Sequence, residues 1–164
     1  MKFPRTSILA VCVAALGLMM GSCTNYPNGP AVSLQSAISK ISNVVWTVRE
    51  AANGNTDLTA SFAGDTFEFA DDGTYRREDA ARLISLPPFT ADQIVPVTGR
   101  GEWEFVNGST QIELFYTYEF TDPYNSNVSY REDLNEAWDV YRLTTTELWL
   151  QNGTIFLKLI PQDD

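Results

Sequence analysis

Apolar and polar residues alternate with a period of two along most of the chain after residue 43, and this pattern predicts β-strands. We expect eight strands, near residues 44–49, 58–70, 74–79, 97–106, 110–120, 137–143, 147–151 and 154–160, with a bend or bulge at Gly64. Four turn pairs punctuate them: Asn53-Gly54, Asp72-Gly73, Asn107-Gly108 and Asn152-Gly153. Such pairs tolerate positive φ and are typical of hairpins. The pattern therefore predicts an antiparallel, all-β chain.

The last three turn pairs also predict the register of their hairpins. The expected opposite pairs are Phe69 with Tyr75, Trp103 with Ile112, and Leu150 with Ile155. The same alternation places a set of aromatic residues on the inward face: Trp46, Phe67, Phe69, Trp103, Tyr116, Tyr118 and Trp138. These side chains either fill the core or line a cavity, because an eight-stranded barrel is just wide enough to be filled or to hold one small ligand.

A short helix is expected before the first strand, because Leu34, Ile38 and Ile41 recur at helical spacing behind Ser33. Trp149 and Phe156 lie on the face opposite to their leucine neighbours and should point outward. We expect the helix to cover this pair, and a partner surface is the alternative.

Eight consecutive short strands hide their edges best by closing. The predicted fold is an eight-stranded antiparallel up-and-down β-barrel with a short N-terminal helix, and an open sandwich is the alternative.

The N-terminus has the features of a secretory signal. Lys2 and Arg5 precede an apolar run that ends near Met20, which is too short to span a bilayer as a permanent helix. The ending Met20-Gly21-Ser22-Cys23 resembles the lipobox of bacterial lipoproteins, in which the cysteine takes a diacylglyceryl thioether. This resemblance implies a signal peptide over 1–22, a lipidated Cys23 with a tether to residue 32, a domain over 33–164 and an outer-membrane location.

Composition narrows the functional classes. The chain of 164 residues has a formal net charge of −10, so nucleic acid is an unsuitable partner. It has no histidine, and no thiol remains once Cys12 is removed with the signal peptide and Cys23 is lipidated. We therefore expect a non-enzyme with no cofactor and no metal. Glu102, Glu104 and Glu113 form a solvated acidic face in this interpretation, because calcium sites generally gather their ligands in a loop.

Several short motifs together resemble the lipocalin-like lipoproteins of Bacteroidetes. They are Val45-Trp46-Thr47, the run from Phe67 through Asp72-Gly73-Thr74 to Tyr75, Gly101-Glu102-Trp103, and the run from Trp138 to Thr144. Their order and spacing cover most of residues 44–160. The resemblance implies a lipocalin-like barrel with eight strands and little defined chemistry.

Two long connections are expected, at about 80–96 and 121–136, and strand parity places both at one end of the barrel. Lipocalins open their ligand cup at that end. The expected ligand contacts are Phe89, Tyr124 and Tyr130, with Trp46 and Trp138 deeper inside. The resulting hypothesis is a lipid-anchored, non-catalytic envelope protein that binds a small apolar ligand at the barrel mouth. The alternative is a structural or protein-interaction module whose barrel is filled, with the two loops as a hydrophobic plug.

Overall fold

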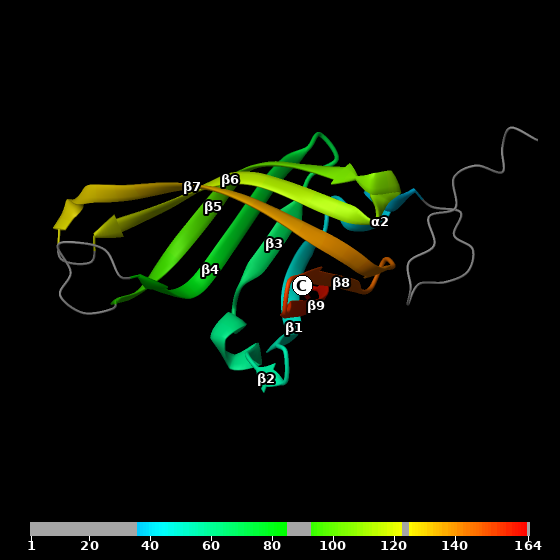
Figure 1. The fold of residues 1–164 in the computed structure, drawn as a ribbon. Helices are drawn as coiled ribbons and strands as arrows, with labels where there is room; N and C mark the ends of the chain where they lie inside the picture. Colours follow the sequence, from blue (N-terminus) through cyan, green and yellow to red (C-terminus); the bar gives the residue numbers. More distant parts are fainter. Residues whose placement is uncertain (1–35, 85–92, 123–124, 164) are drawn as a thin grey trace, which may run out of the picture.

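A computed structural model describes residues 36–84, 93–122 and 125–163, and they form a β-barrel with one small helix (Figure 1). The helix is α2 (Ala37–Ile41), and two 3-10 turns are η1 (Thr59–Phe62) and η2 (Asn107–Ser109). The strands are β1 (Val45–Asn53), β2 (Thr56–Asp57), β3 (Thr66–Phe69), β4 (Thr74–Ile84), β5 (Gln93–Val106), β6 (Gln111–Asp122), β7 (Asn125–Leu143), β8 (Leu148–Asn152) and β9 (Ile155–Pro161). No helix within the described ranges is long and apolar enough to cross a membrane.

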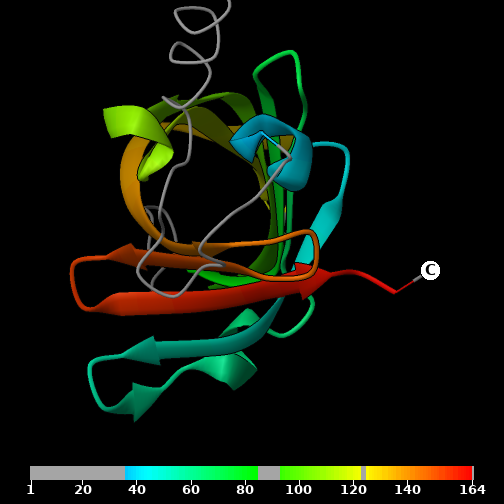
Figure 2. The ribbon, with the colours of Figure 1, turned by 90° about the vertical axis from the view of Figure 1, so that its right-hand side faces the viewer.

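Eight antiparallel strands close into the barrel, as the alternation predicts. Strands β1 and β3 to β9 pair with their neighbours in chain order, and β1 pairs with β9 to complete the circle. The view down the axis shows the closed ring, with the short β2 attached to β1 outside it (Figure 2). Closure removes most of the exposed sheet edges, which is the physical reason for this architecture.

The barrel is much longer on one side than on the other. Strands β4 to β7 extend well beyond β8 and β9, so that the long strands project from one end of the ring (Figure 1). Strand β8 pairs with β7 only between Asp139 and Leu143. Residues 125–138 of β7 therefore pair on one side alone, with β6. Among the described strands, residues 125–138 of β7 thus have a free backbone edge.

Helix α2 lies on one side of the rim at the end of the barrel where β1 begins, and we call this end the helix end (Figure 2). Its cap is Ser36, whose side chain accepts a hydrogen bond from the Ser39 amide at 3.1 Å. Ile41 is fully buried in the core, and its carbonyl oxygen accepts from the Trp46 indole nitrogen at 2.9 Å. The helix thus inserts Ile41 into the core at this end of the barrel.

The expectation that this helix covers Trp149 and Phe156 is wrong. Trp149 lies on the outer face, where Arg142 and Lys158 approach its ring to 5.4 and 5.5 Å. Phe156 contacts the same ring edge to face, with centroids 6.1 Å apart. The aliphatic and charged parts of two long cationic side chains therefore shield these rings, whereas Ile41 is directed into the core. Leu34 lies outside the described residues.

The seven aromatic side chains expected to point inward are all buried in one core. Phe69 stands at its centre, 5.4 Å from the rings of both Tyr75 and Trp103. Leucines from β8 and β9 complete the packing from the opposite wall. The inward face was thus predicted correctly from the period-two pattern alone.

Of the three predicted registers, one is confirmed and two are wrong. Phe69 pairs with Tyr75 as expected. Trp103 pairs with Leu114 and Leu150 with Leu157, so each of these hairpins is displaced by two residues. In the last hairpin Asn152 still belongs to the strand and Gly153, at φ 58°, takes the first turn position. In the other, residues 107–110 form a longer connection in which three consecutive residues have positive φ. A displacement of two preserves the face of every side chain.

The expected strand over 58–70 and both expected long connections are also wrong. The first half of 58–70 is η1, and Gly64, at φ 89°, lies in the turn that leads into β3. Residues expected in the first connection belong largely to β4 and β5, which leaves only 85–92 between them. The second connection is almost entirely β7. Charged residues on the inward face of these strands interrupt the apolar alternation. In the sequence, a strand interrupted in this way has the same pattern as a loop.

Candidate functional site

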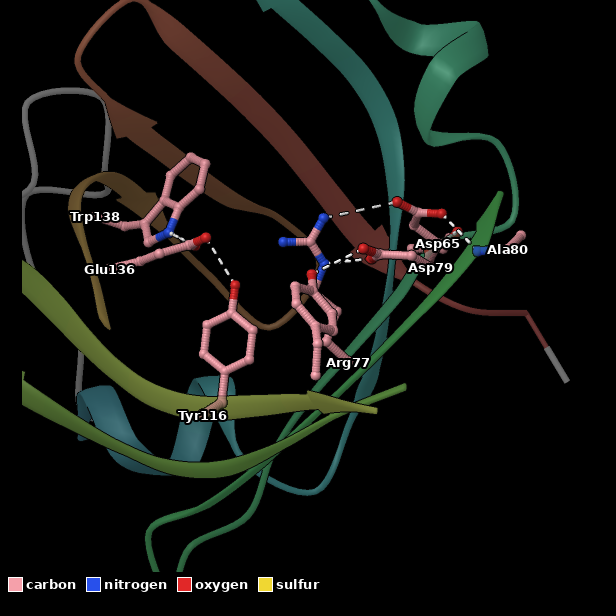
Figure 3. Close-up of polar contacts among 9 residues, drawn as sticks. Asp65, Arg77, Asp79, Ala80, Tyr116, Glu136 and Trp138 are labelled. Carbon is pink, nitrogen blue, oxygen red and sulfur yellow. Dashed lines mark hydrogen bonds and ion pairs between the residues drawn. The ribbon is translucent and has the colours of Figure 1, made fainter. Parts of the chain in front are cut away.

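A buried ion cluster occupies the inside of the barrel next to β3, with Arg77 at its centre (Figure 3). Arg77 and Asp79 occupy successive inward positions on β4, and the guanidinium Nε donates to the Asp79 carboxylate. Asp65 lies just before β3, with its carboxylate 3.8 Å from a guanidinium nitrogen of Arg77. The Tyr118 hydroxyl donates to the second oxygen of Asp79 at 2.8 Å. One guanidinium thus holds two carboxylates.

The surroundings of the cluster explain its electrostatics. Arg77 stacks over the rings of Phe67, at 4.8 Å, and Tyr118, at 5.8 Å. Burial, and then the neighbouring charge of Asp79, raise the pKa of Asp65 to about 6. The Asp65 carboxylate also accepts a hydrogen bond from the Ala80 amide at 2.9 Å. This backbone donor of β4 lies past the last residue that pairs with β3, so the carboxylate satisfies it in place of the sheet. Asp65 therefore ties the segment that follows η1 to β4.

A second polar group faces this cluster from β6 and β7. The Glu136 carboxylate accepts from the Tyr116 hydroxyl at 2.7 Å and from the Trp138 indole nitrogen at 2.8 Å (Figure 3). Both donors belong to the buried core, so the carboxylate lies inside the barrel. Burial, followed by the charge of Glu136, raises the pKa of the Tyr116 hydroxyl above its usual value. Both donors to Glu136 are therefore neutral at physiological pH.

Exposure along the inward face of β7 shows where the barrel is accessible. Leu143 and Val140, near the helix end, are buried, and so is Trp138. Glu136 and Leu134 are only partly buried, and Glu132, on the same face, is exposed. An inward side chain that solvent still reaches means that other side chains do not fill the space beside it. The accessible part of the interior therefore begins at Glu136, behind the unpaired stretch of β7.

Tyr75 carries an unsatisfied hydroxyl in the same interior. Its side chain is 1% exposed, and the hydroxyl has no hydrogen-bond partner in the described part of the chain. The ring packs against Tyr116 with centroids 5.2 Å apart. Burial raises the pKa of Tyr75 well above its usual value, and the charges of Arg77 and Glu136 also act on this hydroxyl. A buried polar group without a partner costs roughly 1–3 kcal/mol, which marks the network as incomplete.

Of the expected ligand contacts, Trp138 and Tyr130 lie on the inward face of β7, where Trp138 is buried and Tyr130 is partly buried. Tyr130 stacks on Phe120 with ring centroids 5.1 Å apart, toward the far end from the helix. Trp46 is completely buried under α2, away from the accessible region. Phe89, Tyr124 and Cys23, the expected site of lipidation, lie outside the described residues.

Sequence reasoning missed the charged residues of the interior: Asp65, Arg77, Asp79 and Glu136. A signal for three of them was present. Arg77 and Asp79 follow Tyr75 at intervals of two, and Glu136 precedes Trp138 by two, so each shares the face of an inward aromatic residue. Asp65 has no such signal, because it precedes its strand.

The acidic outer face expected around Glu102, Glu104 and Glu113 is present, with Glu104 opposite Glu113. A hollow of about 450 Å³ lies beside it, lined by Asp72, Gly73, Thr74, Glu102, Trp103, Glu104 and Phe115. Within the described residues, no group of three or more potential ligands is arranged to hold a metal ion. This face therefore offers a shallow acidic surface, and the chemistry gathers inside the barrel.

Comparisons with known proteins add no assignment. Neither the protein families nor the curated proteins that were compared with this chain contain a match to it. Any functional assignment must therefore come from the geometry of the barrel interior.

Proposed function

We propose that the protein is a lipid-anchored cell-envelope barrel, related to the lipocalin-like lipoproteins, that binds a small molecule in its interior. The observation that carries the proposal is the partial accessibility of Glu136, a side chain whose hydrogen bonds lie inside the barrel. A barrel that served only as a scaffold would be filled with apolar side chains at this level. In this proposal the ligand enters beside the free edge of β7, along the stretch that β8 does not pair with.

The proposed ligand has an apolar body and a polar group. Leu134, the neighbouring inward residue of β7, offers apolar surface beside Glu136, and Tyr130 lies farther along the same face; both pack against the core. Ligand pockets of this kind combine a mainly apolar lining with a few polar groups that fix orientation. The anchor at Cys23, the outer-membrane location and the absence of catalysis belong to the same proposal, and they rest on the sequence features of the N-terminus and on the lack of histidine.

A filling substitution tests this function. Leu134→Trp adds volume to the accessible interior, and Phe115→Trp introduces the same residue on the outer face, where Phe115 is 42% exposed. We expect wild type and Phe115→Trp to bind the neutral apolar dye N-phenyl-1-naphthylamine and Leu134→Trp to bind it at least about tenfold more weakly. Native mass spectrometry of protein from its own host should then show a co-purifying small molecule. Equal dye binding by all three proteins would place the site elsewhere.

A further inference from the structure

We propose that the ligand carries a positive charge, as an organic ammonium group that pairs with the Glu136 carboxylate inside the barrel. This inference rests on the proposed function and specifies its ligand class. It follows from three features of the interior: an imbalance of charge, free capacity on the Glu136 carboxylate, and a wall of aromatic rings around it.

The charges of the interior do not balance. Asp65 and Asp79 share the guanidinium of Arg77, and Glu136 has no ion-pair partner among the described residues. The other buried cation of the described chain, Lys40, belongs to α2 and forms no ion pair with Glu136. Glu132 adds a further carboxylate on the same face of β7, nearer to the solvent. A partly desolvated carboxylate is stabilised by a cation, and the protein itself supplies none here.

The Glu136 carboxylate retains room for another donor. An ionised carboxylate has about four lone-pair sites, and two are used by the Tyr116 hydroxyl and the Trp138 indole nitrogen. These two neutral donors fix the carboxylate in place without neutralising it. The unpartnered hydroxyl of Tyr75, whose ring lies against Tyr116, independently shows that the polar network of this interior lacks a member. An added ammonium group supplies donors and charge together.

The aromatic surroundings suit the same head group. Tyr116 and Trp138 flank the carboxylate and meet it through the hydroxyl and the indole N–H on their ring edges, so aromatic surface borders the position of the head group. A neutral alcohol could donate a hydrogen bond to the Glu136 carboxylate, but it has no positive charge to pair with it. A carboxylate ligand would be repelled by Glu136 and by Glu132. The interior therefore selects among ligands of equal apolar body by the charge of their head group.

Three probes that share a benzyl group and are similar in size test this selection: phenethylamine, which is a cation at neutral pH, 2-phenylethanol, which is neutral, and phenylacetate, which is an anion. Each is measured by its displacement of N-phenyl-1-naphthylamine from the wild-type protein. We expect the amine to displace the dye at a concentration at least about tenfold lower than the alcohol, and phenylacetate to be the weakest. Dye binding without a preference for the amine would overturn this inference and leave the proposed function intact. Failure of the dye itself to bind would count against the proposed function.

Two charge-removing variants locate the effect. Glu136→Gln keeps the shape of the side chain, and Asp133→Asn removes one charge from the outer face of the same strand, where that side chain is 80% exposed. We expect the preference for amine over alcohol to fall to near unity in Glu136→Gln and to persist in Asp133→Asn. If Glu136→Gln unfolds, as circular dichroism would show, Tyr116→Phe provides a second test, because loss of the hydroxyl that holds Glu136 should reduce the preference at least about twofold. An unchanged preference in the folded variants would overturn the inference.

Discussion

Replacement of Arg77 by methionine should be the most revealing single perturbation of the fold. The substitution keeps much of the apolar stem but removes the guanidinium that holds Asp79 and Asp65 and lies over Phe67. Removal of one partner from a buried ion pair typically costs about 3–5 kcal/mol, because the remaining charge is left uncompensated. Asp65 can take up a proton more easily than an ordinary aspartate, since its pKa is already about 6. We therefore expect a loss of about 3 kcal/mol at pH 7, and a smaller loss at pH 5.

The control for this variant is Arg76→Met, one residue away and on the outer face. Arg76 pairs with Glu78, and both side chains are 49% exposed, so this ion pair should contribute at most about 1 kcal/mol. Urea denaturation followed by circular dichroism gives both free energies of unfolding. Similar losses in the two variants, or a loss below about 1 kcal/mol for Arg77→Met, would refute the assignment of Arg77 as the centre of a buried cluster.

Three further predictions concern packing, pH and the membrane anchor. In Gly101→Ala the added Cβ would lie 2.0 Å from the Phe115 carbonyl oxygen, so thermal denaturation should show that the free energy of unfolding falls by about 3 kcal/mol or more. The control is Gly99→Ala, whose Cβ would meet the Tyr116 ring at 3.0 Å and which should lose less stability. Because the pKa of Asp65 in the folded state lies above its value in the unfolded state, this residue should stabilise the protein by about 1 kcal/mol as the pH falls from 7 to 5. Urea denaturation at a series of pH values should show that Asp65→Asn lacks this gain. Cys23→Ala should abolish labelling by an alkyne fatty acid and leave the protein soluble or uncleaved, whereas a wild type that never takes up label would contradict the anchor.

The sequence was sufficient to predict the barrel because its apolar faces are regular. Trp46, Phe67 and Phe69 fall on one face by simple alternation, and the burial of these residues follows. The Asp72-Gly73 turn even predicts its register, because Gly73 has the positive φ that the turn needs, at 88°. In the other hairpins the faces are correct but the pairs are displaced by two residues. Alternation determines which face a residue occupies, and the turn conformation determines its partner.

The interior charges explain why the rest could not be predicted. Glu132 and Glu136 occupy inward positions of β7, where the pattern requires apolar residues, so residues 125–136 resemble a connection in the sequence. Local rules fail most often at sites where a chain carries function rather than packing. The misassigned segment is therefore the segment that bears the proposed ligand site. The contact between Asp65 and Arg77 depends on how η1 leads into β3, which is a tertiary feature.

The indole N–H resonances of the four tryptophans test the central claim most directly. In a ¹⁵N-labelled protein titrated with phenethylamine, the account predicts a saturating shift of the Trp138 indole resonance, because its N–H donates to the carboxylate that receives the ligand. The Trp46 and Trp103 indoles should stay nearly unchanged, since they donate to the backbone carbonyls of Ile41 and Ala70. Trp149, on the outer face, should stay unchanged as well. Saturable binding that shifts only Trp149, or leaves the Trp138 resonance unmoved, would contradict a ligand site inside the barrel.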